Sequence, residues 1–426
     1  MSSLAVIGGG AAGLMAAAAA CEKLPRDARV TVFEKNEKLG KKLYITGKGR
    51  CNLTNTCPTQ ESFGRIVHNP KFLYSAICGF DHDAVMRFFE ENGVPLKEER
   101  GGRVFPVSDH ASDITRALEG ALRRGGARIA LNTRVTRILT ENGRVSGILT
   151  SDGQREAFDA VIIATGGVSY PQTGSTGDGY RFAAQTGHAV MPQRPSLVPM
   201  ETSEVWCRGL QGLSLRNVNV SLYAAGPDGG KQGKCLSGEF GEMLFTHFGV
   251  SGPVILSLSA VPTQTQIDAG LLLEIDLKPA LDEETLDRRL LKDFGKYANQ
   301  QMHNAMKDLL PQRLIGPVLQ QSGVPEERRA NTLTKEARRA IRQTLKGLRL
   351  HVTGLRDFNE AIITRGGVAV RDINASTMES KKVRGLYFAG EVIDADAVTG
   401  GYNLQIAWST GHLAGESASR ALTEGK

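Results

Sequence analysis

The N-terminal segment limits the fold of this chain more than any other part of it. Its sequence VIGGGAAGLMAA (6–17) carries the pattern G-x-G-x-x-G at Gly8, Gly10 and Gly13, after an apolar stretch and before a run of alanines. A buried strand, a glycine turn and a helix are therefore predicted, and RVTVFE (29–34) follows as a second strand. Strand, helix and strand in this order predict an α/β fold built on a parallel sheet.

The chemistry of the turn points to a bound dinucleotide. Glycines permit the tight turn and let backbone amides approach a pyrophosphate, while the helix N-terminus supplies partial positive charge. Glu34 ends the second strand about 20 residues beyond the turn, where an acidic residue accepts hydrogen bonds from ribose hydroxyls. The candidate contacts are Gly8, Gly10, Ala12, Gly13 and Glu34. A turn made only for packing is the alternative, and this motif alone does not distinguish FAD from NAD.

The segment that follows differs from that of a dehydrogenase. EKNEKLGKKLYITGKGRCNLTN (34–55) is basic and rich in glycine. Its cations can meet phosphates, and its glycines allow the backbone to approach a flat ring. The candidate contacts are Lys35, Lys42, Gly47, Arg50 and Asn52. A charged surface loop is the alternative interpretation.

A second glycine-rich turn lies near the C-terminus. GLYFAGE (385–391) is predicted to be a strand that ends in an acid, and a helix is predicted over 401–420. The acid can hold ribityl or diphosphate hydroxyls, and the helix N-terminus can stabilise negative charge on a reduced flavin. The candidate contacts are Gly390, Glu391, Asp394, Gly400, Gly401, Tyr402 and Asn403. Since an NAD-only enzyme has no use for a second anchor, the two turns together predict FAD.

A third segment, ATGG (164–167), gives a weaker signal. It follows an apolar strand, and Thr165 and Gly166 are candidate cofactor contacts. However, it lacks both the full G-x-G-x-x-G pattern and a matching distal acid. A dedicated NAD(P)H domain is therefore not expected, and NAD(P)H is considered only as a transient electron donor.

Composition and charge restrict the class of protein further. The 426 residues are 41% hydrophobic and 23% charged, and no apolar run reaches the length of a membrane span. The cysteines show neither C-x-x-C nor a zinc spacing, so reduced thiols and no metal site are expected. Because the first strand begins at once, no signal peptide is expected, and a cytoplasmic location is predicted.

The net charge of +7 admits an anionic partner such as RNA. Segment 326–350 concentrates basic residues, while Ile341, Leu345 and Leu348 share one face of its predicted helix. Most of the charge therefore lies on the outer side. This side is either an ordinary solvated face or a face that contacts RNA or phosphate.

The order of predicted elements indicates a cofactor domain interrupted by an insert. Residues 1–191 and 349–426 are assigned to the FAD-binding domain, 192–281 to a β-rich, barrel-like insert, and 282–348 to its helical subdomain. Three prolines within 191–200 mark the crossing. Three further expectations concern local structure: antiparallel strands over 127–153, a strand at PVILSLSA (253–260), and a return to α/β character at LRLHVTGL (348–355).

Taken together, the motifs resemble the bacterial flavoproteins grouped as the BaiN/RdsA family. The resemblance rests on VIGGGAAGLMAA, GKGRCNLTN, ATGGVSYPQTGSTGDGY, LFTHFGVSGPVIL and GEVIDADAVTGGYNLQIAWSTG, which span nearly the whole chain. It implies a glutathione-reductase-like FAD domain whose insert is barrel-like and carries a small helical subdomain. The family is associated with reduction of bile-acid enones, dihydrouridine formation in ribosomal RNA and aminoacetone oxidation.

Few residues are candidates for the proton donor that double-bond reduction requires. Cys51 lies in the loop expected beside the flavin, and His247 lies in the insert expected to cover the site. Either residue can instead be structural, since an isolated cysteine or histidine commonly packs in a core. Tyr402 can pack on the flavin ring.

The expected function is therefore hydride transfer from FAD to an activated C=C bond, with uracil in ribosomal RNA favoured slightly over a steroid-like enone. An FAD-dependent amine oxidase that uses O₂ and a non-catalytic FAD-holding RNA-binding protein are the alternatives. The sequence leaves the oligomeric state open.

Overall fold

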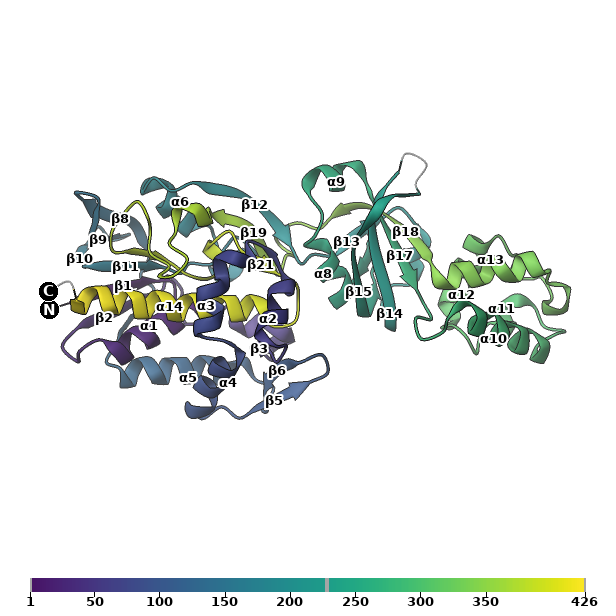
Figure 1. Cartoon of the computed structure of the whole chain (residues 1–426), viewed down its shortest axis with the longest axis horizontal. Coiled ribbons are helices and arrows are strands. Elements are labelled where there is room, and N and C mark those ends of the chain that lie inside the picture. The colour runs from purple at the N-terminus through teal and green to yellow at the C-terminus, as the bar shows by residue number, and fades with distance from the viewer. Residues whose placement is uncertain (1, 227–229, 425–426) are drawn as a thin grey trace. The chain divides into compact units, whose positions relative to one another are not determined.

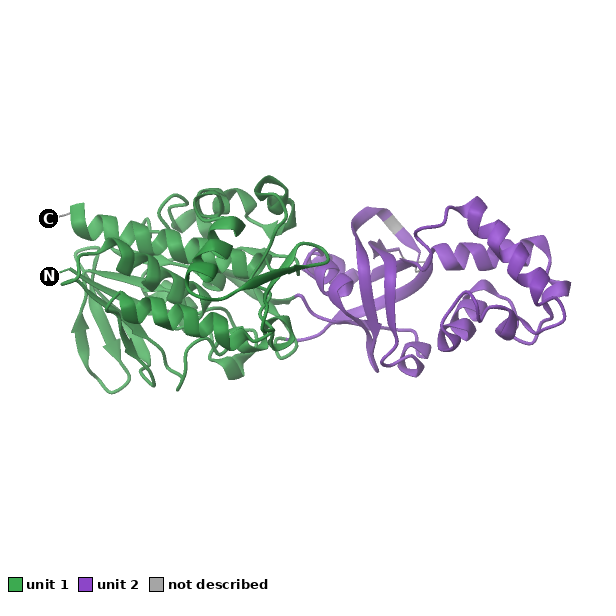
Figure 2. Ribbon diagram, turned by 90° about the horizontal axis from the view of Figure 1, so that it is seen from below, with its two compact units in different colours: residues 1–196, 358–426 green, residues 197–357 purple. Residues whose placement is uncertain are grey.

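The structure is a computed structural model that describes residues 2–226 and 230–424. It divides into two compact units: unit 1 comprises Met1–Ser196 and Phe358–Lys426, and unit 2 comprises Leu197–Asp357 (Figure 2). The outermost residues of the predicted FAD domain, 1 and 425–426, and residues 227–229 of the predicted insert lie outside the described residues.

Unit 1 is built on a parallel sheet with the order β20-β11-β1-β2-β7, whose strands β11, β1 and β2 are labelled in Figure 1. Its described strands are β1 (Ser3–Ile7), β2 (Arg29–Phe33), β7 (Arg128–Ala130), β11 (Ala160–Ile163) and β20 (Leu386–Phe388). β1 lies inside the sheet because its apolar residues are buried on both faces. It pairs with β2 on one side and β11 on the other, so the strand order reverses there. Ligands of such sheets bind at the carboxyl ends of the strands, beside this reversal.

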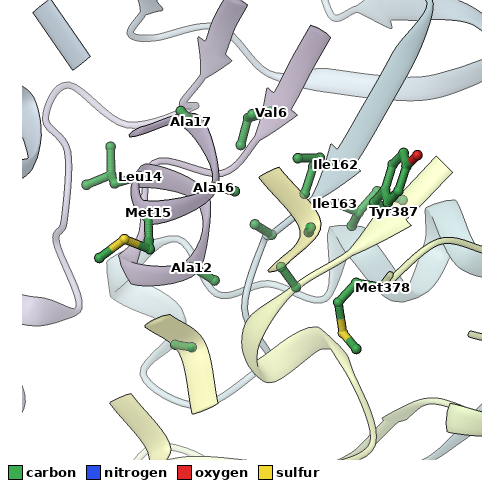
Figure 3. Packing of buried hydrophobic residues seen from close by; sticks show 14 of the residues in the cluster. Val6, Ala12, Leu14, Met15, Ala16, Ala17, Ile162, Ile163, Met378 and Tyr387 are labelled. Atoms are coloured by element: carbon green, nitrogen blue, oxygen red, sulfur yellow. The ribbon is translucent and has the colours of Figure 1, made fainter. Parts of the chain in front are cut away.

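The helices that the structure describes in unit 1 are α1 (Ala11–Lys23), α2 (Thr59–Ser62), α3 (Tyr74–Gly79), α4 (His82–Glu91), α5 (Ala111–Arg124), α6 (Asp178–Gln185) and α14 (Tyr402–Glu424). Two of them, α1 and α14, come from opposite ends of the chain and pack together. Ala16 of α1 is buried in one cluster with Val6 of β1 and Ile162 of β11 (Figure 3).

Helices α1 and α14 approach each other at backbone distance. A Cβ added to Gly411 would lie 2.3 Å from the Ala12 carbonyl oxygen, and one added to Gly415 would lie 2.2 Å from that of Ala16. From the first contact to the second, the residue number rises by four in both helices, so the helices run parallel. Their N-termini therefore point toward the same end of the sheet.

The antiparallel strands beside the main sheet begin later than the sequence indicated. β8 (Val135–Glu141), β9 (Arg144–Thr150) and β10 (Arg155–Ala157) form a separate antiparallel sheet. The expectation was wrong for β7, which pairs in parallel with β2. Helix α5 lies between β2 and β7, and a helical crossover returns the chain in the parallel direction.

Small sheets complete the described part of unit 1. They are formed by β3 (Thr54–Asn55), β6 (Arg103–Pro106) and β5 (Leu96–Glu99); by β4 (Ile66–His68) and β21 (Asp396–Ala397); and by β12 (Val190–Ser196) and β19 (Ile363–Val368). The described chain also forms short 3₁₀ turns, including η1 (Leu43–Gly49) and η7 (Gly390–Val392).

Unit 2 contains a closed barrel in its described residues, with the strand order β13-β16-β15-β14-β17-β18. The strands are β13 (Met200–Thr202), β14 (Ser214–Ala225), β15 (Lys231–Phe245), β16 (Gly249–Ser251), β17 (Leu271–Asp276) and β18 (Leu348–Leu355). The expected return to α/β character at 348–355 was wrong, because β18 pairs with β17 and β13 and closes the barrel. Unit 2 consequently extends to Asp357, beyond the boundary placed at 348/349 from the sequence.

The remaining elements of unit 2 are helical. They are α7 (Trp206–Gly209), α8 (Pro253–Ser259), α9 (Gln264–Ala269), α10 (Glu283–Lys296), α11 (Met302–Ala305), α12 (Gln312–Ser322) and α13 (Lys335–Lys346). The expectation of a strand at PVILSLSA was wrong, because this segment forms α8. Pro253 occupies the first helical turn, where its missing N–H costs nothing, and Val254, Ile255 and Leu258 are buried at helical spacing.

None of the helices within residues 2–226 and 230–424 combines the length and the apolar character needed to cross a membrane.

Alanine at either glycine of the α1–α14 contact is expected to destabilise unit 1. Gly411→Ala and Gly415→Ala would place a methyl group 2.3 or 2.2 Å from a carbonyl oxygen. Overpacking costs about 1–3 kcal/mol, which outweighs the gain of up to about 1 kcal/mol in helix propensity. Thermal unfolding followed by circular dichroism measures the change. Gly295→Ala in α10 is the control, since no atom lies within 4 Å of a Cβ there, and equal behaviour of all three variants would contradict the close contact.

Candidate functional site

The first glycine turn, between β1 and α1, combines close packing with open space. Gly8 has φ +110°, and a Cβ there would lie 2.4 Å from the Ala164 carbonyl oxygen, while one on Gly13 would lie 1.9 Å from that of Gly8. By contrast, a Cβ on Gly10 would meet no atom within 4 Å. No side chain caps α1 at Gly10, so the amides of its first turn face this space without an intrahelical partner. The turn can therefore receive an anionic group such as a pyrophosphate.

Glu34 is held against this turn. It lies directly after β2, is 8% exposed, and accepts a hydrogen bond from the Gly9 amide at 2.8 Å through Oε2. Its Oε1 accepts from the Asn36 backbone amide and side chain, at 2.8 and 2.7 Å. An ionised carboxylate has about four acceptor positions, so capacity for roughly one ribose hydroxyl remains. Asn36, which the motif does not include, fixes this orientation.

The second glycine turn meets the first at the same end of unit 1. Gly390 has φ +75°, and a Cβ there would lie 2.7 Å from Ala12 Cβ. Since Gly411 lies opposite Ala12, α14 begins nine residues before this contact and α1 one residue before it, so the two N-termini are offset by roughly 12 Å along the axis. A ligand that contacts both helix N-termini is therefore elongated, as FAD is.

Glu391 and Lys42 form the central ion pair of this region. The Lys42 ammonium donates to Glu391 Oε2 at 2.6 Å and to Ser169 Oγ at 2.7 Å. Glu391 Oε1 accepts from Ser169 Oγ at 2.9 Å and from the Thr364 amide at 2.8 Å. The network ties the loops after β2 and β11 to β19 and to η7. Ser169 and Thr364 were missed from the sequence: Ser169 lies in the motif ATGGVSYPQTGSTGDGY but nothing there marked it as a contact, and Thr364 lies in none of the motifs.

Lys35 is also engaged by protein groups. It donates to Thr176 Oγ1 at 2.5 Å and to Asp178 Oδ2 at 2.8 Å. Arg134 and Arg181 each lie 3.0 Å from Asp178 Oδ1. Burial works to raise the pKa of Asp178, but the hydrogen bonds and charges of Lys35 and Arg134 outweigh it, so this pKa lies below its usual value. Lys35 thus ties the end of β2 to the N-terminus of α6.

The loop of η1 is shaped by its glycines and by ion pairs. Gly47 has φ +56°, and a Cβ there would lie 2.8 Å from the Asn52 amide nitrogen. Arg50 donates to Glu99 at 2.7 Å and covers the Phe105 ring at 4.1 Å. The Arg50 guanidinium is therefore occupied within the protein and is one of the cations that holds the pKa of Glu99 low.

Two asparagines proposed as cofactor contacts bind the backbone. In the amide orientation that satisfies its neighbours, Asn52 donates to the Thr54 carbonyl at 3.1 Å and accepts from the Gly401 amide at 3.1 Å. Asn403 accepts from the Ala397 amide at 3.0 Å and donates to the Ala397 carbonyl at 2.8 Å. These contacts shape the turn that precedes α14.

The glycines of this turn cannot carry side chains. Gly401 has φ +102°, and a Cβ there would lie 2.4 Å from the Thr54 carbonyl oxygen. Gly400 has φ +118°, and a Cβ there would lie 3.1 Å from the Tyr402 ring. Tyr402 therefore packs over the turn from the first residue of α14.

Other candidates face the protein interior. The Thr165 hydroxyl is buried and has no hydrogen-bond partner among the described residues, and a Cβ on Gly179 of α6 would lie 2.3 Å from it. Gly166 adopts φ +70° beside Ser175. Asp394 receives a hydrogen bond from Asn69 at 3.3 Å, and burial raises the pKa of Asp394 above its usual value.

The two candidate proton donors lie in different units. Cys51 is in unit 1, is 0% exposed, and burial raises the pKa of its thiol to about 12. Such a thiol releases a proton reluctantly and lies among core side chains, which favours a packing role. His247 is in unit 2, exposed between β15 and β16, with its ring against Phe248.

The basic segment 326–350 is partly neutralised within unit 2. Arg338 reaches Asp287 at 3.1 Å, and Arg342 reaches the same carboxylate at 3.4 Å. Lys346 reaches Asp276 at 2.5 Å. In the described part of this segment, the exposed basic residues without a carboxylate partner are Arg329, Lys335 and Arg339.

The fold and the two convergent turns define a class: Rossmann-type proteins that bind one extended dinucleotide and carry an inserted domain. The chain belongs to the HI0933-like protein Rossmann domain family, which it matches over residues 2–417. This is a family of FAD-dependent oxidoreductases, and the resemblance to the BaiN/RdsA group is confirmed.

Two characterised relatives match nearly the whole chain. The 3-dehydro-bile acid delta(4,6)-reductase of Clostridium scindens is 31% identical over 425 residues, covering 98% of this chain and 99% of the relative. The ribosomal RNA dihydrouridine synthase of Haemophilus influenzae is 31% identical over 421 residues, covering 97% and 98%.

Solved structures share the fold at low identity. An Escherichia coli quinol fumarate reductase subunit aligns with a TM-score of 0.52 at 16% identity, over 100% of this chain and 72% of that chain. A 3-ketosteroid delta1-dehydrogenase from Sterolibacterium denitrificans aligns with a TM-score of 0.51 at 14% identity, over 99% and 100%.

Removal of the Lys42 ammonium is expected to destabilise unit 1. In Lys42→Met, Glu391 keeps its charge but loses a charged donor, and hydrogen bonds to charged groups contribute about 1.5–3 kcal/mol. A double-mutant cycle with Glu391→Gln, followed by thermal unfolding, should show strong coupling. Lys41→Met is the control, because Lys41 pairs with Glu37, whose side chain is 61% exposed, and should change stability by less than about 1 kcal/mol. Equal losses in both lysine variants would contradict a special role for the Lys42–Glu391 pair.

The lowered pKa of Asp178 predicts an acid-sensitive contribution to stability. A carboxylate with a depressed folded-state pKa stabilises the protein above its unfolded pKa of about 3.9, and this contribution is lost as the pH falls through the folded-state pKa. Asp178→Asn should therefore lower the free energy of unfolding at pH 7 and flatten its dependence on pH below about 4. Denaturant titrations at several pH values measure both effects. Asp27→Asn, at an exposed position, should change neither the free energy of unfolding at pH 7 nor its dependence on pH. If Asp178→Asn left the pH dependence below about 4 unchanged, the proposed contribution of Asp178 to stability would be wrong.

Proposed function

We propose that this chain reduces an activated carbon–carbon double bond with FAD, and that its substrate is uracil in ribosomal RNA. Membership of an FAD-dependent oxidoreductase family supports the chemistry. Full-length similarity to relatives named ribosomal RNA dihydrouridine synthase, in Haemophilus influenzae and in Escherichia coli at 31% identity each, supports the substrate.

The residues of unit 1 have separate roles in this proposal. The open first turn of α1 receives the pyrophosphate, Glu34 orients the adenosine ribose, and the Lys42–Glu391 pair holds the ribityl end near the N-terminus of α14. Bound FAD supplies a hydride donor once it is reduced. NAD(P)H is the proposed electron source, taken up transiently.

The observation that favours RNA over a small enone is the distribution of charge. The helical subdomain, residues 282–348, contains 13 basic and nine acidic residues, although unit 2 is close to neutral as a whole. After its internal ion pairs are made, Arg329, Lys335 and Arg339 stay exposed without a carboxylate partner among the described residues. Side chains of this kind suit contacts with a phosphate backbone.

Reduction of a steroid-like enone is the second candidate. It is favoured by the relative named 3-dehydro-bile acid delta(4,6)-reductase, which is as similar to this chain as the RNA-modifying relatives are. None of the relatives named above supports the amine-oxidase alternative.

Mass spectrometry of ribosomal RNA from a deletion strain tests the proposed substrate. Dihydrouridine at one or more positions should disappear in the deletion and return when the intact chain is supplied. If the dihydrouridine content of ribosomal RNA is the same in the deletion strain and the parent strain, the proposed RNA substrate is wrong. Anaerobic mixing of the purified holoenzyme with NADH or NADPH tests the electron source, because bleaching of the flavin absorbance is expected without any substrate.

Replacement of the exposed basic residues tests the RNA contact. The triple variant Arg329→Gln, Lys335→Gln, Arg339→Gln should bind ribosomal RNA more weakly, and its dependence of log K on log salt should flatten by about 2–3. A triple variant at exposed residues of unit 1 provides the control: Arg26→Gln, Arg116→Gln, Arg123→Gln. Filter binding at several salt concentrations measures both, and equal slopes for the two triple variants would contradict a specific contact.

A further inference from the structure

A histidine–aspartate pair lies in unit 1 outside the residues proposed to hold FAD. His68 ends β4 and Asp396 begins β21, and His68 Nδ1 is hydrogen-bonded to Asp396 Oδ1. Asp396 is 1% exposed, and Ser196 Oγ donates to its Oδ2 at 3.3 Å. The carboxylate is therefore fixed from both oxygens, and it fixes the orientation of the imidazole in turn.

The backbone places this pair beside the proposed flavin anchors. β4 and β21 are antiparallel partners, with His68 opposite Asp396. The Val398 amide donates to the Arg65 carbonyl at 2.9 Å, and Asn69 donates to the Asp394 carbonyl at 2.6 Å. Residues 65–69 are thus bound along the segment that connects Glu391 with Gly400.

The second nitrogen of His68 is available for chemistry. Nε2 has no hydrogen-bond partner among the described residues, and the His68 side chain is 23% exposed. A histidine whose Nδ1 is engaged by a buried carboxylate keeps one ring orientation, which fixes the direction of its Nε2. This arrangement suits a general acid, whereas the thiol of Cys51 is wholly buried.

Further charges surround the pair. Asp394 interacts electrostatically with both His68 and Asp396. Arg365 of β19 interacts with the two carboxylates and with Arg194 of β12. Burial raises the pKa of Asp394 and lowers that of Arg365, so the charged groups next to the His68–Asp396 pair are partly desolvated.

We propose that His68 is the proton donor of the double-bond reduction and that Asp396 is its positioning residue. The inference rests on the proposed function. The substrate receives a hydride, with its two electrons, from the reduced cofactor at one carbon, and a proton from His68 Nε2 at the other. The C=C π bond is broken, two C–H bonds form, the cofactor is oxidised, and the neutral imidazole regains its proton from water.

Separate measurement of the two half-reactions tests the role of His68. The probe is ribosomal RNA extracted from the deletion strain, added to the reduced holoenzyme. In His68→Gln the rate of double-bond reduction should fall by at least about 100-fold, within the range of general acid catalysis. FAD content, thermal midpoint and the rate of flavin reduction by NAD(P)H should stay within about twofold of those of the parent chain. Partial rescue of His68→Ala by added imidazole would show that the proton, not the fold, was lost.

The dependence on pH distinguishes positioning from a structural role. A general acid works only when it is protonated, so the rate should fall at high pH. Asp396→Asn keeps the shape of the side chain but removes the charge that faces His68 Nδ1, so it should lower the rate of double-bond reduction and alter its pH profile. Proton-detected NMR of the holoenzyme should show a changed His68 Nδ1–H signal in Asp396→Asn without any turnover, because that ring nitrogen is bonded to Asp396. His82→Gln is the control, because His82 Nε2 lies 3.4 Å from Asp83 in α4 of unit 1, whereas the proposed RNA contact lies in unit 2, and the variant should leave the rate and its pH profile unchanged.

The outcomes separate the two proposals. An active parent chain with an unimpaired His68→Gln variant overturns the role of His68 and leaves the proposed function standing. A parent chain that reduces neither this RNA nor a steroid-like enone overturns the proposed function, and the assignment of His68 with it. Selective loss of double-bond reduction in His68→Gln, with a lower rate and an altered pH profile in Asp396→Asn, is the expected result.

Discussion

The backbone contact between α1 and α14 is the interaction on which the rest of unit 1 depends. It is made by residues at opposite ends of the chain, since Ala12 and Ala16 face Gly411 and Gly415. Any side chain at these glycines would force the helices apart. Because the helices run parallel, the contact brings two helix N-termini to one end of the sheet and offsets them along the axis. An elongated cofactor site exists only after this contact has formed.

The ion pairs of the cations near the two turns indicate which groups of this region are suited to bind an anionic ligand. Lys35 faces Asp178, Lys42 faces Glu391, and Arg50 faces Glu99. Each of these three cations has a carboxylate partner inside the protein, so none of the three is held unpaired for a phosphate. The helix N-termini do not need a counterion when no ligand is bound, because their N–H dipoles are fixed by the helix. The amides of the turns, more than the lysines, are therefore suited to receive the pyrophosphate.

Much of the architecture was predictable because it is encoded in local patterns. The G-x-G-x-x-G turn, the acid at the end of β2 and the second glycine turn identify a flavin-type α/β fold without reference to distant contacts. The predictions were wrong for segments whose structure depends on the strands or helices that they pack against. β7 and β18 are short apolar strands whose sheet is set by the strand they meet, and α8 has a composition that suits either a strand or a helix.

The chemical roles of single residues were less predictable than the motifs. Asn52 and Asn403 belong to the motifs, yet they bind backbone groups. Ser169 and Thr364 were not among the predicted contacts, yet they complete the Glu391 network. His68 and Asp396 lie far apart in sequence and meet only through the pairing of β4 with β21. Hydrogen-bond partners depend on separations of a few ångströms, and local sequence does not determine those separations.

By itself, the sequence determined the α/β class, the two glycine turns and the FAD-dependent family, because each follows from residue types at fixed short spacings. Only the tertiary structure decided which polar groups face one another: that Lys42 meets Glu391, that Cys51 is sealed in the core, and that His68 is oriented by Asp396. These contacts join segments that the chain brings together only when its two ends pack through α1 and α14. Their geometry is thus a property of the folded chain as a whole.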